Sequence, residues 1–263
     1  MNATSNHRRA LPAALAALAL AATGCATTND PAQRTYVALG DSYASGFGAG
    51  DYDADDGCHR SAHAFPALVA EAIDEELEFE ACSGAVVADV VEQQLDALDS
   101  AIDFVTITVG GNDSGLEAVL GACADTDTAA CTAAIEEARA LITEDLPGSL
   151  DGLYTQVEAQ AGEATIIVVG YPRLFSETAC EAVLDTTPDE QRAVNELFDL
   201  LADTIAAAAT GHGFAFVDPR DAFDGHELCT EDTWVMGLES AEPFHPNATG
   251  YERYAELVLP HLN

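Results

Sequence analysis

The hydrophobic positions of this chain fall into short continuous runs, separated by longer segments in which apolar residues recur at helical spacing. The runs at 103–109 and 164–170 are rich in Val, Ile and Thr, as expected of strands that are buried on both faces of a parallel sheet. Five such runs predict strands, at 35–40, 77–81, 103–109, 164–170 and 214–217.

Helical spacing fills most of the segments between these strands. It predicts helices at 64–76, 86–98, 129–146 with a continuation to 161, 188–210 and 247–258, the last capped by Asn247. Strands that alternate with helices form a parallel sheet with helices on both faces. The sequence therefore predicts an α/β fold, a three-layer α/β/α sandwich around a five-stranded, parallel, flavodoxin-like sheet.

The N-terminal residues do not follow this alternation. Residues 1–25 combine a basic start, an apolar stretch and small residues before Cys25, which is typical of an export signal and resembles a bacterial lipobox. We expect a signal peptide at 1–25, a lipid on Cys25 that anchors a secreted protein to the cell membrane, a short polar tether at 26–34, and one domain at 35–263. The alternatives are an ordinary cleaved signal with an incidental cysteine, or a membrane-spanning anchor.

The cysteine count agrees with export. If Cys25 carries a lipid, six cysteines remain, and an even number in an exported protein suits three disulfides. Proximity in the sequence favours a pair between Cys123 and Cys131 and leaves the other pairs open.

The charge balance is strongly acidic. The chain has 46 Asp and Glu residues against nine Arg and no Lys, for a formal net charge of −37. Such a surface repels nucleic acids and anionic lipid headgroups, so neither is expected as a partner, and we expect a monomer. A halophilic or salt-tolerant source and an acidic exported proteome of a high-GC genome both explain this charge. A melting temperature that does not rise up to molar salt would reject halophily.

A serine follows the first strand almost directly. Ser42 comes after Gly40 and Asp41 and before small residues, an arrangement that places it at the start of a helix at the carboxyl edge of the sheet. Its hydroxyl could act as a nucleophile there, and its backbone N–H could face a developing anion. Because the tripeptide is short, a turn with a helix-capping residue is the alternative.

Three further residues fall where this fold would need them. Gly84 follows the second strand, where a glycine lets a backbone N–H approach a ligand. Asn112 follows the third strand and offers a side-chain NH₂ group, and His245 precedes the last helix. Each has a purely structural explanation alone, but together with Ser42 they predict a serine-based active site.

These motifs resemble those of the SGNH hydrolases, also called GDSL esterases and lipases, over residues 35–260. The matching positions are Ser42 in Gly-Asp-Ser-Tyr, Gly84 in Cys-Ser-Gly-Ala, Asn112 in Gly-Gly-Asn-Asp and His245 in Phe-His-Pro-Asn. The resemblance implies an esterase or lipase without a cofactor, with Ser42 as nucleophile and His245 as general base. It also implies an oxyanion hole formed by Ser42, Gly84 and Asn112.

The chain looks most similar to the secreted actinobacterial branch of this family, which has three disulfides. By that resemblance the disulfides would be Cys58–Cys82, Cys123–Cys131 and Cys180–Cys229.

The sequence departs from the commonest family pattern at the third member of the triad. That pattern has Asp three residues before the histidine, whereas this chain has Glu242 three residues before His245. In some members of the branch a backbone carbonyl orients the imidazole instead. We expect such a carbonyl here, or a weak contribution from Glu242 as a catalytic residue.

The substrate class follows less directly. Short- to medium-chain acyl esters and lipids are expected, with an O-acetyl-glycan deacetylase and an inactive ligand-binding surface lipoprotein as alternatives. Loops at 47–63, 113–130 and 174–187 are expected to form the pocket, and the lack of a strong amphipathic lid in the sequence favours soluble esters.

No metal site is expected. Residues 51–57 resemble the start of a calcium loop, but the glycine comes one place late and position twelve would be Ala62, so an acidic solvated loop is the preferred interpretation. Zinc is not expected, because the cysteines are assigned to disulfides and the histidines are scattered. Asp41 is expected to make structural hydrogen bonds rather than to act as a catalytic acid.

Overall fold

The computed structural model describes residues 1, 35–53, 57–124, 127–176 and 186–262, and the statements below concern these residues. The chain divides into two compact units, Met1–Ala32 and Gln33–Asn263, and the architecture described here is that of the second. The expected signal peptide, Cys25 and the tether fall at 2–34, outside the described residues, and stay predictions. No helix in the described ranges is long and apolar enough to span a membrane.

Five strands form one parallel sheet in the order β2-β1-β3-β4-β5. They are β1 (Thr35–Gly40), β2 (Glu76–Phe79), β3 (Phe104–Thr108), β4 (Thr165–Val169) and β5 (Ala215–Val217). Each predicted run overlaps its strand, with ends that differ by two residues or fewer. The predicted five-stranded parallel sheet is therefore confirmed.

The strand order places a switch point beside β1. The chain leaves β1 outward to β2 and then crosses back to β3, so the connections after β1 and β3 diverge toward opposite faces of the sheet. Open α/β sheets bind ligands in the crevice at such a point, outside the carboxyl ends of the strands. Ser42 and Asn112 follow these two strands.

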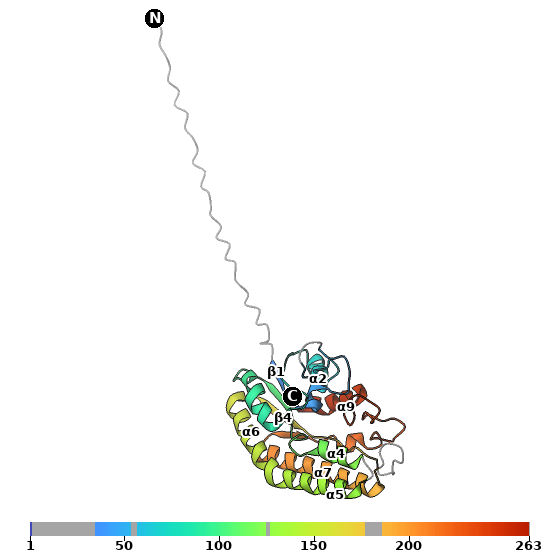
Figure 1. Cartoon of the computed structure of the whole chain (residues 1–263). Helices are drawn as coiled ribbons and strands as arrows, with labels where there is room; N and C mark the ends of the chain where they lie inside the picture. The colour runs from blue at the N-terminus through green and yellow to red at the C-terminus, as the bar shows by residue number, and fades with distance from the viewer. Residues whose placement is uncertain (2–34, 54–56, 125–126, 177–185, 263) are drawn as a thin grey trace. The chain divides into compact units, whose positions relative to one another are not determined.

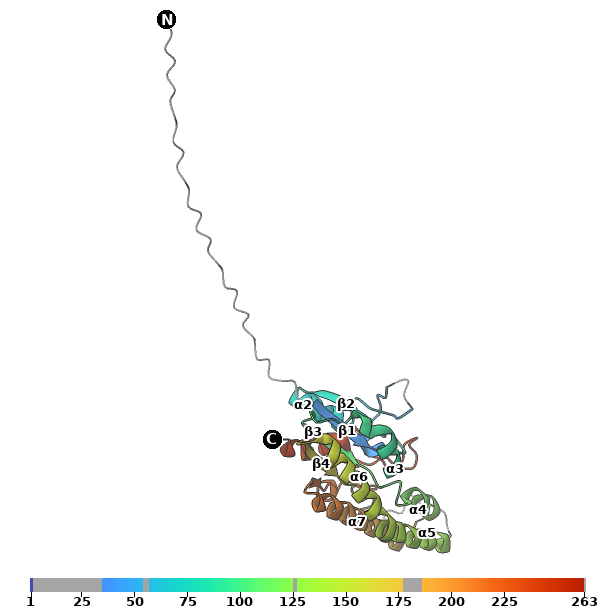
Figure 2. The ribbon, with the colours of Figure 1, turned by 90° about the vertical axis from the view of Figure 1, so that its left-hand side faces the viewer.

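Helices cover both faces of the sheet (Figures 1 and 2). On one face α2 (Phe65–Ile73) packs against α9 (Ala248–Val258), while α6 (Leu146–Ala161) packs against α7 (Pro188–Gly211) on the other. This arrangement confirms the three-layer α/β/α sandwich. Three shorter helical segments are α1 (Ser42–Ser45), α8 (Arg220–Phe223) and the 3₁₀ turn η4 (Leu259–His261).

The helix predicted at 86–98 is divided into three pieces. These are α3 (Val87–Asp89), a π-helical turn η1 (Val90–Gln94) and a 3₁₀ turn η2 (Leu95–Ala97). At the end of the π turn the buried Gln94 side chain accepts from the Gly40 N–H at 2.7 Å and donates to the Gly40 carbonyl at 2.9 Å. These bonds offset the irregular helix geometry, and apolar periodicity alone does not reveal them.

The long helix predicted from 129 is also interrupted. It consists of α5 (Thr128–Ala140), a π turn η3 (Leu141–Asp145) and α6. Pro147 lies in the first turn of α6, and because proline has no N–H it cannot continue a regular hydrogen-bond ladder into that turn. The proline therefore marks where the two α-helices meet.

The prediction of a loop at 113–130 is wrong for part of that range, because the structure has helix α4 (Leu116–Cys123) there. Leu116, Val119 and Cys123 are buried at helical spacing. The helix is short, begins after Gly115 in a left-handed conformation and contains Gly121, so its signal in the sequence is weak.

The core lies between the sheet and its two helical layers. All five residues of β3 are buried, whereas β2 at the sheet edge alternates between exposed and half-buried positions. Tyr36, Leu39 and Ile107 are among the largest fully buried side chains. The buried central strands account for the continuous apolar runs in the sequence.

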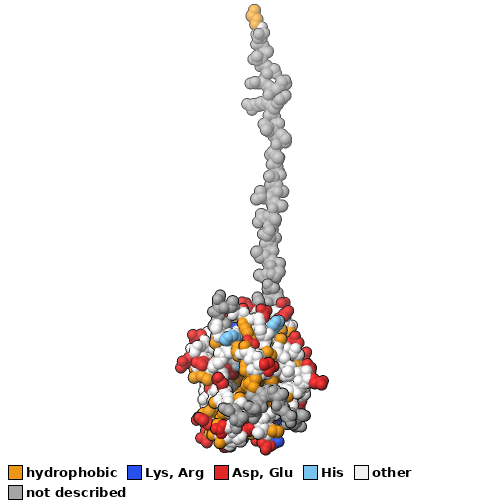
Figure 3. Space-filling model, turned by 45° about the vertical axis from the view of Figure 1, so that its right-hand side comes forward, with side chains coloured by type: hydrophobic (Ala, Val, Ile, Leu, Met, Phe, Trp, Pro, Cys, Tyr) orange, Lys and Arg blue, Asp and Glu red, His pale blue; other side chains and the backbone are white. Residues whose placement is uncertain are grey.

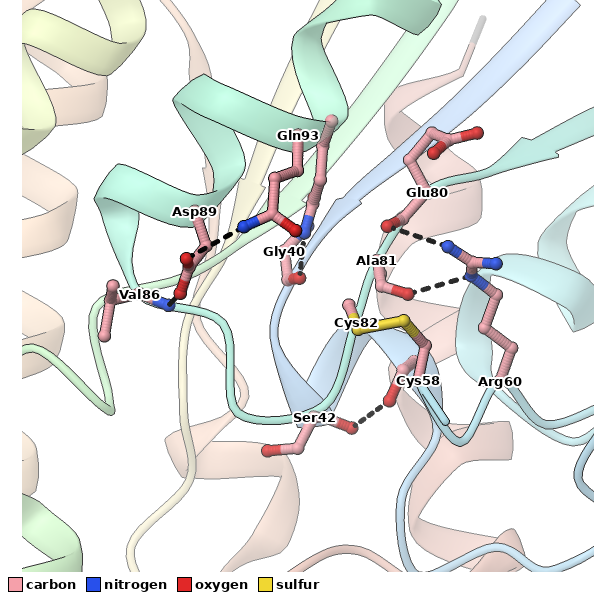
Figure 4. Close-up of a disulfide and its surroundings, with 12 residues drawn as sticks. Gly40, Ser42, Cys58, Arg60, Glu80, Ala81, Cys82, Val86, Asp89 and Gln93 are labelled. Atoms are coloured by element: carbon pink, nitrogen blue, oxygen red, sulfur yellow. Dashed lines mark hydrogen bonds between the residues drawn. A yellow bond between two sulfur atoms is a disulfide. The ribbon is translucent and has the colours of Figure 1, made fainter. Parts of the chain in front are cut away.

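Two of the expected disulfides are present. Cys58–Cys82 joins the segment after α1 to the segment after β2, where Arg60 donates to the carbonyls of Glu80 and Ala81 (Figure 4). Cys123–Cys131 joins the end of α4 to the start of α5. The third expected pair, Cys180–Cys229, includes a cysteine outside the described residues and stays a prediction.

Candidate active site

The chain turns sharply where β1 ends. Gly40 has φ = 133°, and a Cβ there would lie 2.1 Å from the carbonyl oxygen of Thr108 on β3. Any side chain would collide with the neighbouring strand, so this turn requires glycine. The turn makes Ser42 the first residue of α1, with 8% of its surface exposed at the carboxyl edge of the sheet.

Asp41 makes structural hydrogen bonds, as expected. It is 1% exposed, and its Oδ1 caps α1 by accepting from the Tyr43 N–H at 2.9 Å. Its Oδ2 accepts from the Tyr171 hydroxyl at 2.5 Å. Burial raises the pKa of Asp41 to about 7, although both hydrogen bonds oppose that rise. Each carboxyl oxygen of Asp41 therefore has a structural hydrogen-bond donor.

A two-stranded main-chain contact positions the loop that carries His245. The Met236 N–H donates to the His245 carbonyl and the Phe244 N–H donates to the Met236 carbonyl, each at 2.8 Å. Two residues after the histidine, Asn247 caps α9 by accepting from the Gly250 N–H, which confirms the predicted cap. The histidine is therefore held between a fixed loop and a fixed helix start.

The imidazole of His245 faces the Ser42 hydroxyl. Nε2 of His245 lies 2.8 Å from Oγ of Ser42, although 203 residues separate them in the sequence. The rings of Phe47 and Tyr43 pack beside the imidazole, with centroids 4.9 and 5.2 Å away. These contacts restrict the imidazole to the orientation in which it meets the serine.

The other ring nitrogen faces the main chain. Nδ1 of His245 lies 2.8 Å from the carbonyl oxygen of Pro243. Because a carbonyl can only accept, Nδ1 must carry the proton, and Nε2 is then free to accept from the serine hydroxyl. A backbone carbonyl therefore occupies the place that a triad carboxylate would take, as the departure at Glu242 led us to expect.

Burial lowers the pKa of His245 below its ordinary value. Hydrogen bonding to the Pro243 and Glu242 backbone and the negative charge of Glu242 oppose this shift. The imidazole is therefore neutral at neutral pH, the form that can accept a proton.

Gly84 and Asn112 lie on the same pocket as the serine and the histidine. Gly84 has φ = 86°, a conformation that favours glycine. One N–H of the Asn112 amide donates to the Ala85 carbonyl at 2.9 Å, and the amide has a second N–H to offer. The neighbouring Asp113 accepts from the Val87 N–H, so two bonds join the loop after β3 to the loop after β2.

The pocket has a volume of about 550 Å³ and two distinct parts. One part, here called the polar network, comprises the hydrogen-bonded residues Asp41, Gly111, Asn112 and Tyr171. The other, here called the apolar wall, comprises Leu116, Leu120, Leu174, Phe198 and Leu238. Among the described residues that line the pocket, none is Arg or Lys.

Acidic side chains are abundant on the surface of the chain, as the composition predicted. On the face shown in Figure 3, acidic side chains in red lie around the edge and hydrophobic side chains in orange gather toward the middle. Glu117 on α4 adds an exposed carboxylate to the pocket lining.

A cavity of about 1010 Å³ lies beside Arg173 and Asp224, but neither Ser42 nor His245 lines it. Within the described ranges no group of three or more His, Cys, Asp or Glu residues is placed to hold a metal ion. The acidic loop at 51–57 includes 54–56, which lie outside the described residues.

Sequence reasoning missed two parts of the site and left a third without a residue number. A backbone carbonyl was expected to orient His245, but the sequence did not identify Pro243 as its source, because a main-chain group has no residue-type signature. The hydroxyl of Tyr171 reaches Asp41 from 130 positions away in the sequence, although the Gly-Tyr-Pro-Arg motif around it marks the end of β4. The wall residues on α4 follow helical spacing, and that spacing was the available signal.

Comparisons with known proteins agree with this geometry. The model of the GDSL-like lipase/acylhydrolase family matches residues 38–253. A lipase of Streptomyces rimosus is 39% identical over 252 residues, which cover 94% of this chain and 92% of that protein. Lipase 1 of Streptomyces coelicolor is 41% identical over 249 residues, which cover 90% of this chain and 92% of that protein.

Solved structures give the same result. The crystal structure of phospholipase A1 from Streptomyces albidoflavus NA297 superposes with a TM-score of 0.82 at 41% identity, covering 88% of this chain and 99% of that one. The extracellular lipase from Streptomyces rimosus superposes with a TM-score of 0.81 at 39% identity, covering 88% of this chain and 98% of that one. An acetylxylan esterase from Geobacillus stearothermophilus shares the fold. Its TM-score is 0.57 at 16% identity, covering 88% of this chain and 94% of that one.

Proposed function

The chain belongs to the GDSL-like lipase/acylhydrolase family and is a carboxylic ester hydrolase, and we propose that it cleaves acyl esters through a covalent intermediate on Ser42. The observation that carries this proposal is the 2.8 Å contact between Ser42 Oγ and His245 Nε2 at one end of an apolar pocket. A serine hydroxyl becomes a strong nucleophile when a neighbouring base accepts its proton.

In the first step Ser42 Oγ attacks the ester carbonyl carbon as its proton moves to Nε2 of His245. The carbonyl oxygen gains negative charge in the tetrahedral intermediate. The backbone N–H groups of Ser42 and Gly84 and the second N–H of Asn112 would bind this oxygen. The bond to the alcohol oxygen then breaks, and that oxygen takes the proton from His245 as the alcohol leaves.

In the second step water hydrolyses the acyl-enzyme. His245 accepts a proton from the water, whose oxygen attacks the acyl carbon. The bond to Ser42 Oγ breaks, and the serine regains its proton from the imidazole. The products are the alcohol and the carboxylic acid, and the enzyme returns to its starting protonation state.

The orienting group in this mechanism is the carbonyl of Pro243. Its bond to Nδ1 selects the tautomer that the base needs, and it stabilises the imidazolium as that cation forms. Glu242 contributes through its negative charge, which raises the pKa of His245. We assign Glu242 this supporting role instead of that of a triad acid.

The substrate that fits best is a neutral ester with an aliphatic acyl chain. The apolar wall offers Leu and Phe side chains to such a chain, and burial of each methylene contributes about 0.8 kcal/mol. Related proteins are named lipase and phospholipase A1, which also act on acyl esters. An acetylated glycan would place a two-carbon acyl group and a polar sugar against this wall, so deacetylation is the less favoured alternative.

We also propose that the protein is secreted. The N-terminal signal-like segment and the extracellular Streptomyces rimosus lipase support export, and the two disulfides suit an oxidising compartment. Lipidation of Cys25 and a monomeric state are further parts of this proposal. Labelling cells with a radioactive fatty acid would test lipidation, because Cys25→Ser should abolish incorporation.

The catalytic proposal is tested by kinetics on p-nitrophenyl butyrate. Ser42→Ala should lower kcat by a factor on the order of 10⁴ or more, because it removes the nucleophile. Ser149→Ala, an exposed serine on α6, is the matched control and should change kcat less than twofold. Retention of full activity by Ser42→Ala would overturn the mechanism.

A further inference from the structure

Tyr171 bridges two of the loops that form the site. It follows β4, is 2% exposed, and its hydroxyl makes two hydrogen bonds. The hydroxyl donates to Oδ2 of Asp41 at 2.5 Å and accepts from the Gly111 N–H at 3.0 Å. Asp41 precedes Ser42 and Gly111 precedes Asn112, so each bond is made one residue from a proposed oxyanion donor.

These bonds complete a closed set of links among three loops. The loops after β1 and β2 are joined where the Cys82 N–H donates to the Gly40 carbonyl. The loops after β2 and β3 are joined where Asn112 donates to the Ala85 carbonyl. Between β1 and β3, the Asp41 N–H donates to the Thr108 carbonyl. Beyond that main-chain bond, Tyr171 joins the loops that follow the two strands.

The tyrosine ring also fixes the position of Gly111 by contact. A Cβ on Gly111 would lie 3.2 Å from Cζ and 3.3 Å from the hydroxyl oxygen of Tyr171, so ring and backbone meet because this residue is glycine. The ring of Tyr43, on α1, also contacts the Tyr171 ring in a T-shaped arrangement, with centroids 5.0 Å apart. The ring therefore cannot move toward either loop without displacing it.

We propose that Tyr171 is a positioning residue for the hydrolysis, holding the oxyanion donors of Ser42 and Asn112 at their working separation. This inference rests on the proposed function. The hydroxyl touches no reacting atom in this scheme, because Asp41 and Gly111 occupy it. Burial and the charge of Asp41 hold the pKa of Tyr171 well above its ordinary value, so it stays a donor throughout the working pH range.

The decisive variant is Tyr171→Phe, which keeps the ring and removes both hydrogen bonds. We expect kcat on p-nitrophenyl butyrate to fall about tenfold with KM changed less than twofold, because the loss falls on the transition state. Affinity for butylboronic acid, which forms a tetrahedral adduct on the serine, should fall by a similar factor.

Two other buried tyrosines provide matched controls. Tyr36→Phe removes a buried hydroxyl that bonds to Thr106 on the neighbouring strand, so it should lower the melting temperature but change kcat less than twofold. Tyr154→Phe removes a buried hydroxyl for which the described residues provide no partner, so it should change neither kcat nor boronate affinity. These controls separate a fall in kcat that follows from reduced stability from one that follows from misplaced oxyanion donors.

Gly111→Ala tests the same contact from the other side and serves if Tyr171→Phe does not fold. Its Cβ would press on the tyrosine ring at 3.2 Å, so kcat should again fall with little change in KM. The positioning role is overturned if Tyr171→Phe, or Gly111→Ala where the first variant does not fold, matches Tyr36→Phe in kcat and boronate affinity. An active Ser42→Ala enzyme would instead overturn the proposed function itself.

Discussion

The polar network and the apolar wall of the pocket are built in opposite ways. Asp41 and Tyr171 in the network are almost fully buried, come from the ends of β1 and β4, and are fixed by directional hydrogen bonds of 2.5–3.0 Å. The wall comes from α4, α7 and two loops, and apolar packing instead of directional hydrogen bonds holds its side chains, from the buried Leu174 to Leu238, which is 39% exposed. Directional bonds set the geometry that chemistry needs, whereas apolar contacts depend on area and tolerate change. We therefore expect substitutions in the network to slow all substrates alike and substitutions in the wall to change their ranking.

The largest effect should come from Asn112→Ala in the network. Removing one oxyanion donor should lower kcat by roughly 10²–10³, and by the same factor for butyrate and decanoate esters. Steady-state kinetics on both p-nitrophenyl esters measures this. A loss confined to one chain length would show that Asn112 acts in substrate selection. The contrast drawn between the network and the wall would then be wrong.

The pH profile tests His245, the proposed base, which lies in the same pocket as the network. Because burial lowers the pKa of His245 below its ordinary value of 6.5, the midpoint of the acid limb of kcat/KM should lie below pH 6.5. Below the midpoint the fall should be about tenfold per pH unit, as expected for one proton.

Asp41 is the control for this profile, because its pKa of about 7 also lies near neutrality. If His245 sets the acid limb, Asp41→Asn should not move the midpoint of the kcat/KM profile once the profile of each enzyme is scaled to its own maximum. A limb centred above pH 6.5, or one that Asp41→Asn removes, would contradict the assignment.

A smaller and more selective effect is expected from Gly121→Leu in α4. Gly121 lines the pocket, and a Cβ there would meet no atom within 4 Å, so the larger side chain would occupy space meant for the acyl chain. Each methylene displaced from the wall should cost about fourfold in kcat/KM. Decanoate hydrolysis should therefore fall about tenfold or more while butyrate hydrolysis changes less than twofold.

Gly148→Leu provides the matched control for this variant. Gly148 is an exposed helical glycine on α6, and a Cβ there also meets no atom within 4 Å. Gly148→Leu should change kcat/KM for neither the decanoate nor the butyrate ester. An equal decline of decanoate and butyrate hydrolysis in Gly121→Leu would show that α4 does not select chain length.

The smallest effect in the set is expected from Glu242→Ala. If the Pro243 carbonyl orients His245, the loss in kcat should stay within about tenfold, since only a nearby charge is removed, whereas loss of a triad acid can cost about 10⁴. Glu239→Ala is the control, because it changes the net charge of the protein by the same amount at a nearby position. A loss above about a hundredfold would return Glu242 to the role of triad acid.

Local sequence signals predicted most of the fold and the main site residues. The apolar runs located all five strands, and Gly-Asp-Ser, Gly-Gly-Asn-Asp and Phe-His-Pro-Asn each stand at a strand end or helix start, where parallel topology brings them together. Such signals work because turn and capping chemistry depends on a few adjacent residues.

The parts that were not predicted depend on distant or main-chain groups. Gln94 distorts its helix to reach Gly40, 54 positions away, and Tyr171 reaches Asp41 from the other half of the chain. A backbone carbonyl was expected beside His245, but the sequence could not show that Pro243 supplies it, because every residue has such a carbonyl. Tertiary contacts decide these features, so periodicity and motif spacing cannot reveal them.

The most direct test of the account is mass spectrometry of the protein after treatment with a fluorophosphonate. We predict one adduct per molecule, on the peptide that contains Ser42, formed rapidly by the native protein and at least a hundredfold more slowly by His245→Ala. An adduct on another residue, or one that forms on Ser42 equally fast without the imidazole, would contradict the proposed pairing of these two side chains.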